Sequence, residues 1–492
     1  MNYYIGADLG TSSLKLLLVD ATGKIEKIVS HDYPVSFPYP SWSEQEPHHW
    51  WSAFKNGVKE LTKDFPKEQI KGIGFGGQMH GLVCLDENDR VIRPAILWND
   101  GRTQKETDYL NEIIGKKALS QMTANIAFAG FTAPKLLWMK ANEPDNFNKI
   151  NKIMLPKDYL NYLLTGVHCT DFSDASGLLL LDVKNKDWSE QMLEICSVTK
   201  AQMPRLFESF QIVGTILPQI AEEIGLCTDT IVVAGAGDNA AAAIGTGTVA
   251  DGKCNISLGT SGTIFISSDK FSVDSSNALH SFCHADGGYH FMGCILSAAS
   301  CNKWLYEDIF KTDDYDKEQA SITDDYLGNN HVYFLPYLMG ERSPINDTDA
   351  RGTFTGIRLD TKRENITLAV LEGVAFAIRD NFEIAKEQGI KISYSTLCGG
   401  GAKSKLWQKI FANVLNIPIM LPQTEQGPGY GGAMLAMVGA KEFESVEDCV
   451  DSFIKIKETI NPQKEIAEKY RLQYAKFKKL YPSMKNLFKE LK

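Results

Sequence analysis

The tetrapeptide Leu-Gly-Thr-Ser occurs twice in this chain, at Leu9–Ser12 and again at Leu258–Ser261. Each copy follows a short run that is typical of a strand, and β-rich residues follow each copy. A Gly-Thr-Ser turn exposes backbone N–H groups and two hydroxyls with little side chain in the way, which suits a phosphate oxygen. The repeat therefore predicts two similar halves, each opening with a strand–turn–strand unit, that could hold a polyphosphate between them.

The overall composition excludes several classes of protein. The length of 492 residues suits two domains better than one core, and the net charge of −10 argues against a dedicated nucleic-acid binder. No apolar run approaches the roughly 20 residues that span a bilayer, and the N-terminal residues do not form a basic-then-apolar signal segment. The ten cysteines include no CxxC pair and indicate buried thiols. We therefore expect a cytoplasmic protein with neither a nucleic-acid nor a membrane partner.

Strand and helix patterns alternate along the chain and favour α/β layers. Tyr3–Ala7 and Leu14–Val19 are predicted to pair as a hairpin, and Ile70–Gly76 to form a further strand. The second half restarts at Asn255 with the duplicated turn, and the glycine-rich segment Gly245–Gly252 is the expected hinge. Further helices are expected around 239–245, 365–386, 406–415 and 433–438, with a solvated, lysine-rich helix from residue 462 onward.

Asp8 stands at the end of the first strand, immediately before the first Gly-Thr-Ser turn. A carboxylate beside a phosphate loop is repelled unless a cation lies between them, so Asp8 is a candidate for holding Mg²⁺ through water. The alternative is an aspartate that only caps its turn by accepting backbone N–H groups. Lys15, just beyond the turn, either adds positive charge near the phosphates or is an ordinary surface lysine.

The segment VVAGAGDNA, which ends at Ala240, contains a G-x-G-x-x-A pattern between a strand and a helix. This resembles a dinucleotide-binding fingerprint, but Asp238 would place a negative charge where the pyrophosphate must lie. At a helix N-terminus, Asp238 is expected to be ionised and to align a substrate hydroxyl for attack. Asn239 could donate a hydrogen bond to a neighbouring hydroxyl. The alternative is an N-cap aspartate without a substrate.

Other polar or glycine-rich segments also follow strands. Gly76–Gly81 sets Met79, an adaptable apolar surface, and His80, a hydrogen-bonding group, between glycines. The alternative is a satisfied histidine in a turn. Trp98 is either a platform for a sugar face or part of the core, and Gly399–Ala402 either lets an adenine lie against bare backbone or is a tight turn.

Two further segments have simpler interpretations. The HSFCH segment at His280–His284 suggests a metal site, but it has no second ligand cluster and no acidic residue nearby, so we expect none there. The glycine-dense segment Gln426–Gly432 is predicted to be a turn leading into a helix, with close backbone packing.

Taken together, these segments resemble the FGGY family of carbohydrate kinases, which belongs to the actin-like, sugar-kinase and heat-shock ATPase superfamily. The resemblance covers nearly the whole chain, with the motifs in the same order. The matching segments are DLGTSSLK, SWSEQEP, GQMHG, LWNDGR, FTAPKLLW, LPKDYL, GDNA, SLGTSG, FLPYLMGERSP, LEGVAF and GGGAKS.

The resemblance implies an α/β fold of two ribonuclease H-like (actin-like ATPase) domains with an active-site cleft between them. It implies a sugar-binding domain over residues 1–246, a nucleotide-binding domain over 247–440, and a helical tail over 441–492 packed on the second domain. The segments GQMHG, LWNDGR and SFCHA are similar to the branch of the family that phosphorylates D-xylulose, whereas glycerol kinases carry a different, Arg-Glu-containing segment. A homodimer is the family's usual state.

Residue roles also follow from the resemblance. Asp238 is similar to the catalytic base that acts on the C5 hydroxyl of D-xylulose, and Asp8 to the carboxylate associated with Mg²⁺. ATP and Mg²⁺ are the implied cofactors. The implied sugar contacts are Met79 and His80, supported by Asn239 and Trp98. The implied ATP-binding residues are Thr11, Ser12, Gly259, Thr260, Gly400, Gly401 and Ala402.

Three rival interpretations share some of these features. The first is a kinase for another ketose or polyol, such as ribulose or gluconate, because one or two pocket residues can re-tune a polyol site. The second is an actin-like filament former or chaperone ATPase, which would share both turns but would not need the hydroxyl-binding residues. The third is a sugar-binding regulator without catalysis, against which Asp8 and Asp238 argue. Tyr430 departs from the family pattern by adding bulk near the expected nucleotide side.

Overall fold

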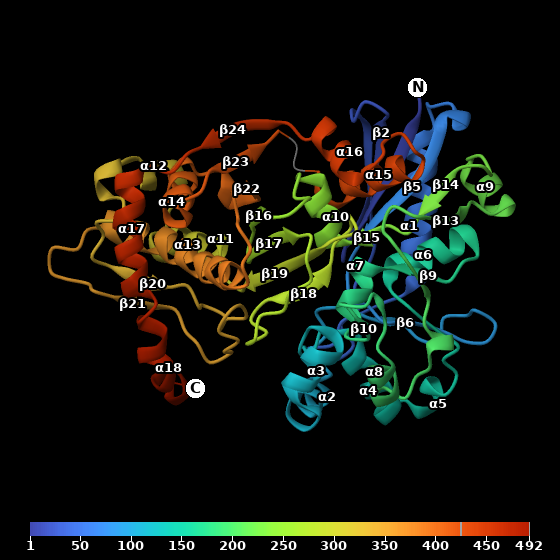
Figure 1. Cartoon of the computed structure of the whole chain (residues 1–492), viewed down its shortest axis with the longest axis horizontal. Helices are drawn as coiled ribbons and strands as arrows, with labels where there is room; N and C mark the ends of the chain where they lie inside the picture. The colour runs from blue at the N-terminus through green and yellow to red at the C-terminus, as the bar shows by residue number, and fades with distance from the viewer. Residues whose placement is uncertain (424–425, 492) are drawn as a thin grey trace.

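The computed structural model describes residues 1–423 and 426–491. Its framework is a pair of seven-stranded sheets, one in each half of the chain (Figure 1). The strands of the first sheet are β1 Tyr3–Leu9, β2 Ser13–Asp20, β3 Ile25–Asp32, β5 Ile70–Gly77, β13 Ile212–Thr215, β14 Ile231–Val233 and β15 Ala236–Gly237. Those of the second are β16 Lys253–Leu258, β17 Gly262–Ser268, β18 His280–Cys283, β19 Tyr289–Ile295, β22 Tyr394–Cys398, β23 Ile419–Pro422 and β24 Ile456–Ile460.

The two sheets repeat one arrangement around the duplicated turn. The first has the order β13-β14-β5-β1-β2-β3, with β15 beside β5, and the second β18-β19-β17-β16-β22-β23-β24. β1 pairs antiparallel with β2 and parallel with β5, just as β16 pairs antiparallel with β17 and parallel with β22. The predicted α/β fold and the predicted hairpin are therefore confirmed, as is the strand that begins at Ile70.

Each half also has its own hydrophobic core. In the first half, helix α1 (Pro47–Thr62) covers β2 and β3. In the second, the long helix α13 (Arg363–Glu387) packs against α14 (Lys405–Leu415) and β17. The helices predicted around 365–386 and 406–415 are thus confirmed.

The halves meet where α15 (Gly427–Gly439) packs on α10 (Asp238–Gly245) and on β1 and β5 of the first sheet. Glycines allow this close approach: a Cβ on Gly6 would lie 1.8 Å from the carbonyl oxygen of Gly429, and one on Gly431 2.0 Å from that of Ala241. The turn predicted over Gln426–Gly432 is wrong, because the helix already begins at Gly427. The expected close backbone packing is confirmed.

The halves also meet at β18, the edge strand of the second sheet. The Asn125 side chain donates to Ser281 O (2.9 Å) and accepts from Ser281 N (3.1 Å). Phe282 and Cys283 of β18 are buried in a cluster made mostly of residues from the first half. The contact of α15 with α10 and this second contact therefore join the halves at two separate places.

The last part of the chain returns to both halves. Helix α16 (Val446–Phe453) packs on α15, and α17 (Lys464–Phe477) and α18 (Leu480–Glu490) lie on the second half, as Figure 1 shows. Helix α17 carries lysines on its exposed side but buries Tyr470, Tyr474 and Phe477. None of the helices within residues 1–423 and 426–491 combines the length and apolar character that a membrane crossing requires.

Short elements complete the fold. The helices are α2 Gln104–Asp108, α3 Lys116–Thr123, α4 Thr132–Asn142, α5 Pro144–Phe147, α6 Pro156–Thr165, α7 Phe172–Ala175, α8 Glu190–Ile195, α9 Pro218–Ile224, α11 Ala299–Lys303 and α12 Tyr315–Ala320. The strands are β4 Glu44–Gln45, β6 Val83–Leu85, β7 Ala95–Ile96, β8 Lys152–Met154, β9 Cys169–Asp171, β10 Leu181–Asp182, β11 Asp187–Trp188, β12 Arg205–Phe207, β20 Tyr333–Leu335 and β21 Thr353–Thr355.

Candidate active site

A cavity of about 230 Å³ lies between the two halves of the chain. Its walls from the first half include all five residues predicted to act on the sugar, which are Met79, His80, Trp98, Asp238 and Asn239. The first half also contributes Phe128, Gly130 and Phe131, and the second half contributes Ser261, Thr263, Met292, Cys294 and Arg342.

Asp238 is the first residue of α10 and follows directly on β15. The backbone N–H of Asn239 donates to its Oδ1 (2.7 Å), and the preceding Gly237 N–H donates to Ser173 Oγ (3.1 Å). Burial raises the pKa of Asp238 to about 7, the negative charge of Asp8 adds to the rise, and the Asn239 N–H opposes it. The sequence predicted an aspartate kept ionised by the helix N-terminus, but desolvation dominates. A carboxylate that titrates near neutrality is suited to act as a general base.

His80 lies just beyond the end of β5, with a left-handed φ of 67°. Its Nδ1 lies 2.7 Å from the carbonyl oxygen of Gly177. Because a carbonyl only accepts, Nδ1 carries the hydrogen, and Nε2 is left as an acceptor. Burial lowers the pKa of His80 to about 3, and the cations of Lys135 and Arg342 lower it further, so the ring is neutral. Its ring stacks on Phe131 at 4.6 Å between centroids.

Met79 and Trp98 line the same cavity in different ways. Met79 is buried, and its sulfur lies 3.8 Å from Asn239 Nδ2. Trp98 is 45% exposed, so it is not part of the core. Its indole N–H donates to Thr11 Oγ1 (3.0 Å). This hydrogen bond links the wall of the cavity to the first Gly-Thr-Ser turn.

A larger cavity, of about 560 Å³, opens on the second half. It is lined by three of the predicted ATP-binding residues, Thr260, Gly400 and Gly401. Ala402 is buried in the core of the second half and is not part of this lining. The sequence did not identify other lining residues, among them Ser300, Asn302, Lys303, Tyr315, Gln319 and Trp407.

The second Gly-Thr-Ser turn separates the two cavities. Thr260 lines the larger cavity and the adjacent Ser261 lines the smaller one. The turn is held from behind, because the N–H of Ala299 donates to Gly259 O (2.9 Å) and that of Ala298 to Thr260 O (2.9 Å). A phosphate held at this turn would therefore lie between the two cavities.

The first Gly-Thr-Ser turn is flanked by two charged residues, Asp8 and Lys15. Lys15 Nζ lies 3.9 Å from Asp8 Oδ2, so the lysine faces the carboxylate that precedes the turn. Burial raises the pKa of Asp8 and the lysine opposes the rise. Thr11 accepts from Trp98, and the Ser12 carbonyl accepts from Tyr33 N (3.0 Å).

The donor set at Asp8 suits a hydrated cation. Within the described residues, no group of three or more His, Cys, Asp or Glu side chains is arranged to hold a metal ion. A lone carboxylate beside a phosphate turn fits a cation that keeps most of its water and is shared with phosphate oxygens.

The histidines of the HSFCH segment contact other groups of the protein. His280 packs on Phe128 and Phe282, and His284 Nε2 lies 2.8 Å from Thr248 O.

Arg342 is a lining residue that the sequence did not single out. It lies in the second half but reaches the smaller cavity, where its guanidinium lies 5.5 Å from the ring centroid of Phe128. Its backbone is held firmly, because the Glu341 carboxylate accepts from Arg342 N (2.7 Å) and from Leu296 N (2.8 Å). The FLPYLMGERSP segment that contains it was the available signal, but no local pattern predicts where the arginine points.

Comparisons with known proteins agree with this architecture. Residues 3–245 match the N-terminal domain of the FGGY family of carbohydrate kinases, and residues 254–440 match its C-terminal domain. The chain belongs to the FGGY family of carbohydrate kinases. Like other FGGY kinases, it is an ATP-dependent sugar kinase with the two-domain, actin-like architecture. Its family therefore excludes the filament-former and chaperone interpretations.

Several FGGY proteins are similar to the chain over nearly its whole length. The xylulose kinase of Escherichia coli K12 is 38% identical over 483 residues, which cover 98% of this chain and 99% of that protein. A crystal structure of a "xyloylose kinase" from Brucella ovis has 40% identity and a TM-score of 0.93, with 99% and 100% of the two chains covered. A gluconate kinase structure from Lactobacillus acidophilus has 25% identity and a TM-score of 0.94, with both chains fully covered.

Proposed function

We propose that this FGGY kinase transfers the terminal phosphoryl group of ATP to D-xylulose and forms D-xylulose 5-phosphate. The observation that carries the proposal is a small interdomain cavity that is lined both by Asp238, a carboxylate with a pKa of about 7, and by Ser261 of the second Gly-Thr-Ser turn. The similarity to xylulose kinases at 38% identity and above supports this sugar.

In the proposed reaction, Asp238 accepts the proton of the C5 hydroxyl. The freed oxygen attacks the terminal phosphorus, the bond from phosphorus to the bridging oxygen breaks, and ADP leaves. Neutral His80 accepts a hydrogen bond from another hydroxyl through Nε2, and the Asn239 amide orients the sugar. Thr260, Gly400 and the neighbouring backbone hold the nucleotide in the larger cavity. Contact between the two halves expels the water that would otherwise take the phosphoryl group.

We further propose that Mg²⁺ is the divalent cation and that Asp8 holds it through water. When bound, the cation would neutralise charge on the phosphates. The half-buried position of Asp8 beside the first turn and its contact with Lys15 support this assignment. Thr11, Ser12 and Gly259 are proposed to face the phosphates through their backbone, whereas Ala402 would support the adenosine loop from the core.

The remaining proposals concern the organisation of the protein. We propose domains over 1–246 and 247–440 with a tail over 441–492, supported by the family matches to 3–245 and 254–440. A cytoplasmic location is supported by buried cysteine thiols such as those of Cys84, Cys169 and Cys254. A homodimer is proposed from the family's habit, and sedimentation analysis tests it.

A coupled assay of ADP release tests the function across a panel of D-xylulose, D-ribulose, gluconate and glycerol. We expect kcat/KM to be highest for D-xylulose. A preference for gluconate would assign the rival substrate, for which the Lactobacillus acidophilus gluconate kinase is the precedent. ATP turnover that is independent of every sugar in the panel would contradict the proposal.

A further inference from the structure

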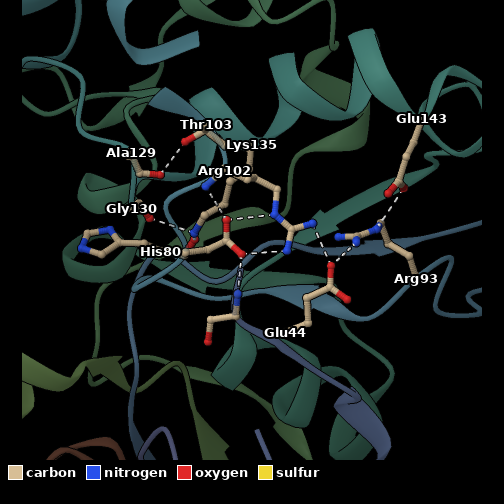
Figure 2. Close-up of polar contacts among 11 residues, drawn as sticks. Glu44, His80, Arg93, Arg102, Thr103, Ala129, Gly130, Lys135 and Glu143 are labelled. Atoms are coloured by element: carbon tan, nitrogen blue, oxygen red, sulfur yellow. Dashed lines mark hydrogen bonds and ion pairs between the residues drawn. The ribbon is translucent and has the colours of Figure 1, made fainter. Parts of the chain in front are cut away.

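Lys135 of α4 is fully buried directly behind the smaller cavity. Its ammonium donates to the carbonyl oxygens of His80 (2.7 Å) and Gly130 (2.8 Å), and Thr132 Oγ1 donates to the same His80 oxygen (3.0 Å). Figure 2 shows the Lys135 contacts with His80 and Gly130 side by side. No ion pair formed within residues 1–423 and 426–491 includes Lys135. The buried Lys135 amine is therefore held mainly by main-chain oxygens.

The nearest carboxylate, Asp100, is already occupied. It accepts from Arg102 Nε (2.9 Å) and Nη2 (2.7 Å), and from Ser43 N (2.6 Å). Arg102 continues into a row of ion pairs that runs outward through the side chains of Glu44, Arg93 and Glu143 (Figure 2). Lys135 thus lies at the inner end of this row, without a carboxylate of its own.

Such a position is unfavourable for a lysine. Burial lowers its pKa to about 7, the Arg102 cation adds to the fall, and Asp100 opposes it. An unbranched apolar side chain of similar length would avoid this desolvation penalty. Attraction to Asp100 and the hydrogen bonds to the His80 and Gly130 carbonyl groups offset this penalty, and only the hydrogen bonds are direct contacts of the Lys135 amine.

Both carbonyl groups belong to turns that form the wall of the cavity. His80 has a φ of 67°, in the left-handed region that a residue with a Cβ rarely adopts, so its backbone needs external support. Gly130 immediately precedes Phe131, on which the His80 ring stacks. One ammonium therefore ties together the backbones of both stacked residues.

We propose that Lys135 is a positioning residue of the sugar site, which holds the His80 turn and the Phe131 turn in register so that His80 Nε2 faces the sugar. This inference rests on the proposed function, because it assigns His80 to sugar binding. It gives the lysine of the FTAPKLLW segment a role that acts through the two turns and not through contact with the substrate.

The test compares Lys135→Met with Lys140→Met in the full chain. Lys140 lies on the same helix, is exposed and donates to Ser197 Oγ (2.6 Å), so it is a matched control. We expect Lys135→Met to raise the KM for the sugar by about 10- to 100-fold and to leave the KM for ATP within about twofold. Lys140→Met should leave both values within about twofold of wild type.

A second variant keeps the test decisive if Lys135→Met does not fold. Thr132→Val removes the other donor to the His80 carbonyl and keeps the shape of the side chain. We expect it to raise the KM for the sugar by about 3- to 10-fold. Unchanged sugar KM values in both variants would overturn the proposal.

A readout without turnover separates this proposal from the proposed function. In ¹⁵N-histidine spectra, His80 of the wild type and of Lys140→Met should stay the neutral Nδ1–H tautomer between about pH 5.5 and 8. In Lys135→Met or Thr132→Val we expect its resonances to shift, because the His80 turn loosens. If the wild type phosphorylates no ketose, the proposed function fails while these spectra still decide the role of Lys135. Identical His80 spectra in all variants would overturn it.

Discussion

The two Gly-Thr-Ser turns share a sequence and differ in their neighbours. In the first hairpin Leu9 lies opposite Leu14, whereas in the second Leu258 lies opposite Gly262, so the second turn is the tighter one. Asp8 precedes the first turn and pairs with Lys15, while Ser257 occupies the matching place before the second. The duplicated peptide therefore forms two similar turns of different tightness, and a carboxylate precedes only the first.

The two turns also contact different parts of the protein. Thr11 of the first turn accepts hydrogen bonds from Gln45 Nε2 (2.6 Å) and from Trp98, which lines the sugar cavity. Thr260 of the second turn is exposed to the nucleotide cavity and is held from behind by the start of α11. We infer that the first turn, with Asp8, holds the cation and supports the wall of the sugar cavity. The second turn holds the nucleotide and separates the two cavities.

The largest expected difference between the turns concerns their preceding residues. Asp8→Asn should lower kcat by about 100- to 1000-fold, because the cation that neutralises the phosphates loses its carboxylate partner. Ser257→Ala should change kcat by less than about threefold. Steady-state kinetics over a range of Mg²⁺ concentrations measures both. Equal losses in the two variants would show that the turns do the same work.

The acid limb of the pH profile tests how the first turn acts on the base. Because the pKa of Asp238 is about 7 and its ionised form is the active one, kcat/KM for the sugar should fall about tenfold per pH unit below that value. The negative charge of Asp8 contributes to this raised pKa. The acid limb of the residual kcat/KM of Asp8→Asn should therefore lie at lower pH than that of the wild type. A limb that moves upward, or one that stays in place, would contradict the coupling.

The threonines of the two turns should affect different substrates. Thr260→Val is expected to raise the KM for ATP by about 5- to 10-fold and to leave the KM for the sugar unchanged. Thr11→Val removes the acceptor of the Trp98 indole and should raise the KM for the sugar by about 3- to 5-fold. A raised KM for the sugar in Thr260→Val, or a raised KM for ATP in Thr11→Val, would contradict the proposed roles of the two turns.

Tyr430 provides the smallest expected effect on catalysis. Its hydroxyl donates to Gly23 O (2.7 Å), and its ring lies in a buried cluster formed by α15, α16 and the first half of the chain, outside the lining of the nucleotide cavity. Tyr430→Leu should therefore leave the KM for ATP unchanged and lower the free energy of unfolding by about 1–3 kcal/mol. Denaturant unfolding and ATP titration check the two parts separately.

Local patterns predicted much of this site. The turn that follows β1, the helix that begins at Asp238 and the Met79–His80 pair between glycines each depend on neighbouring residues, so the sequence contained the signal. Helix α15 was harder, because Gly429, Gly431 and Gly432 inside it have low helix propensity. Close packing of its glycines on the first sheet and on α10 overrides that preference.

Contacts between distant segments could not be predicted in this way. Arg342 reaches the sugar cavity from the other half of the chain. Lys135, on helix α4, donates to the His80 carbonyl from 55 residues further along the chain. The pKa of Asp238 also could not be predicted locally. The helix N-terminus favours the charged form, but burial outweighs this effect, and burial depends on residues that are distant in the sequence.

The most direct test of the account is the turnover of Asp238→Asn with D-xylulose and ATP. The folded pKa of about 7 lies above the unfolded value of about 3.9, so ionisation of Asp238 destabilises the fold as pH rises through this window. The variant should therefore be at least as stable as the wild type at pH 8, with unchanged ligand binding and a kcat lower by at least about 1000-fold. A folded variant that retains more than a few per cent of wild-type kcat would contradict the assignment of Asp238 as the base.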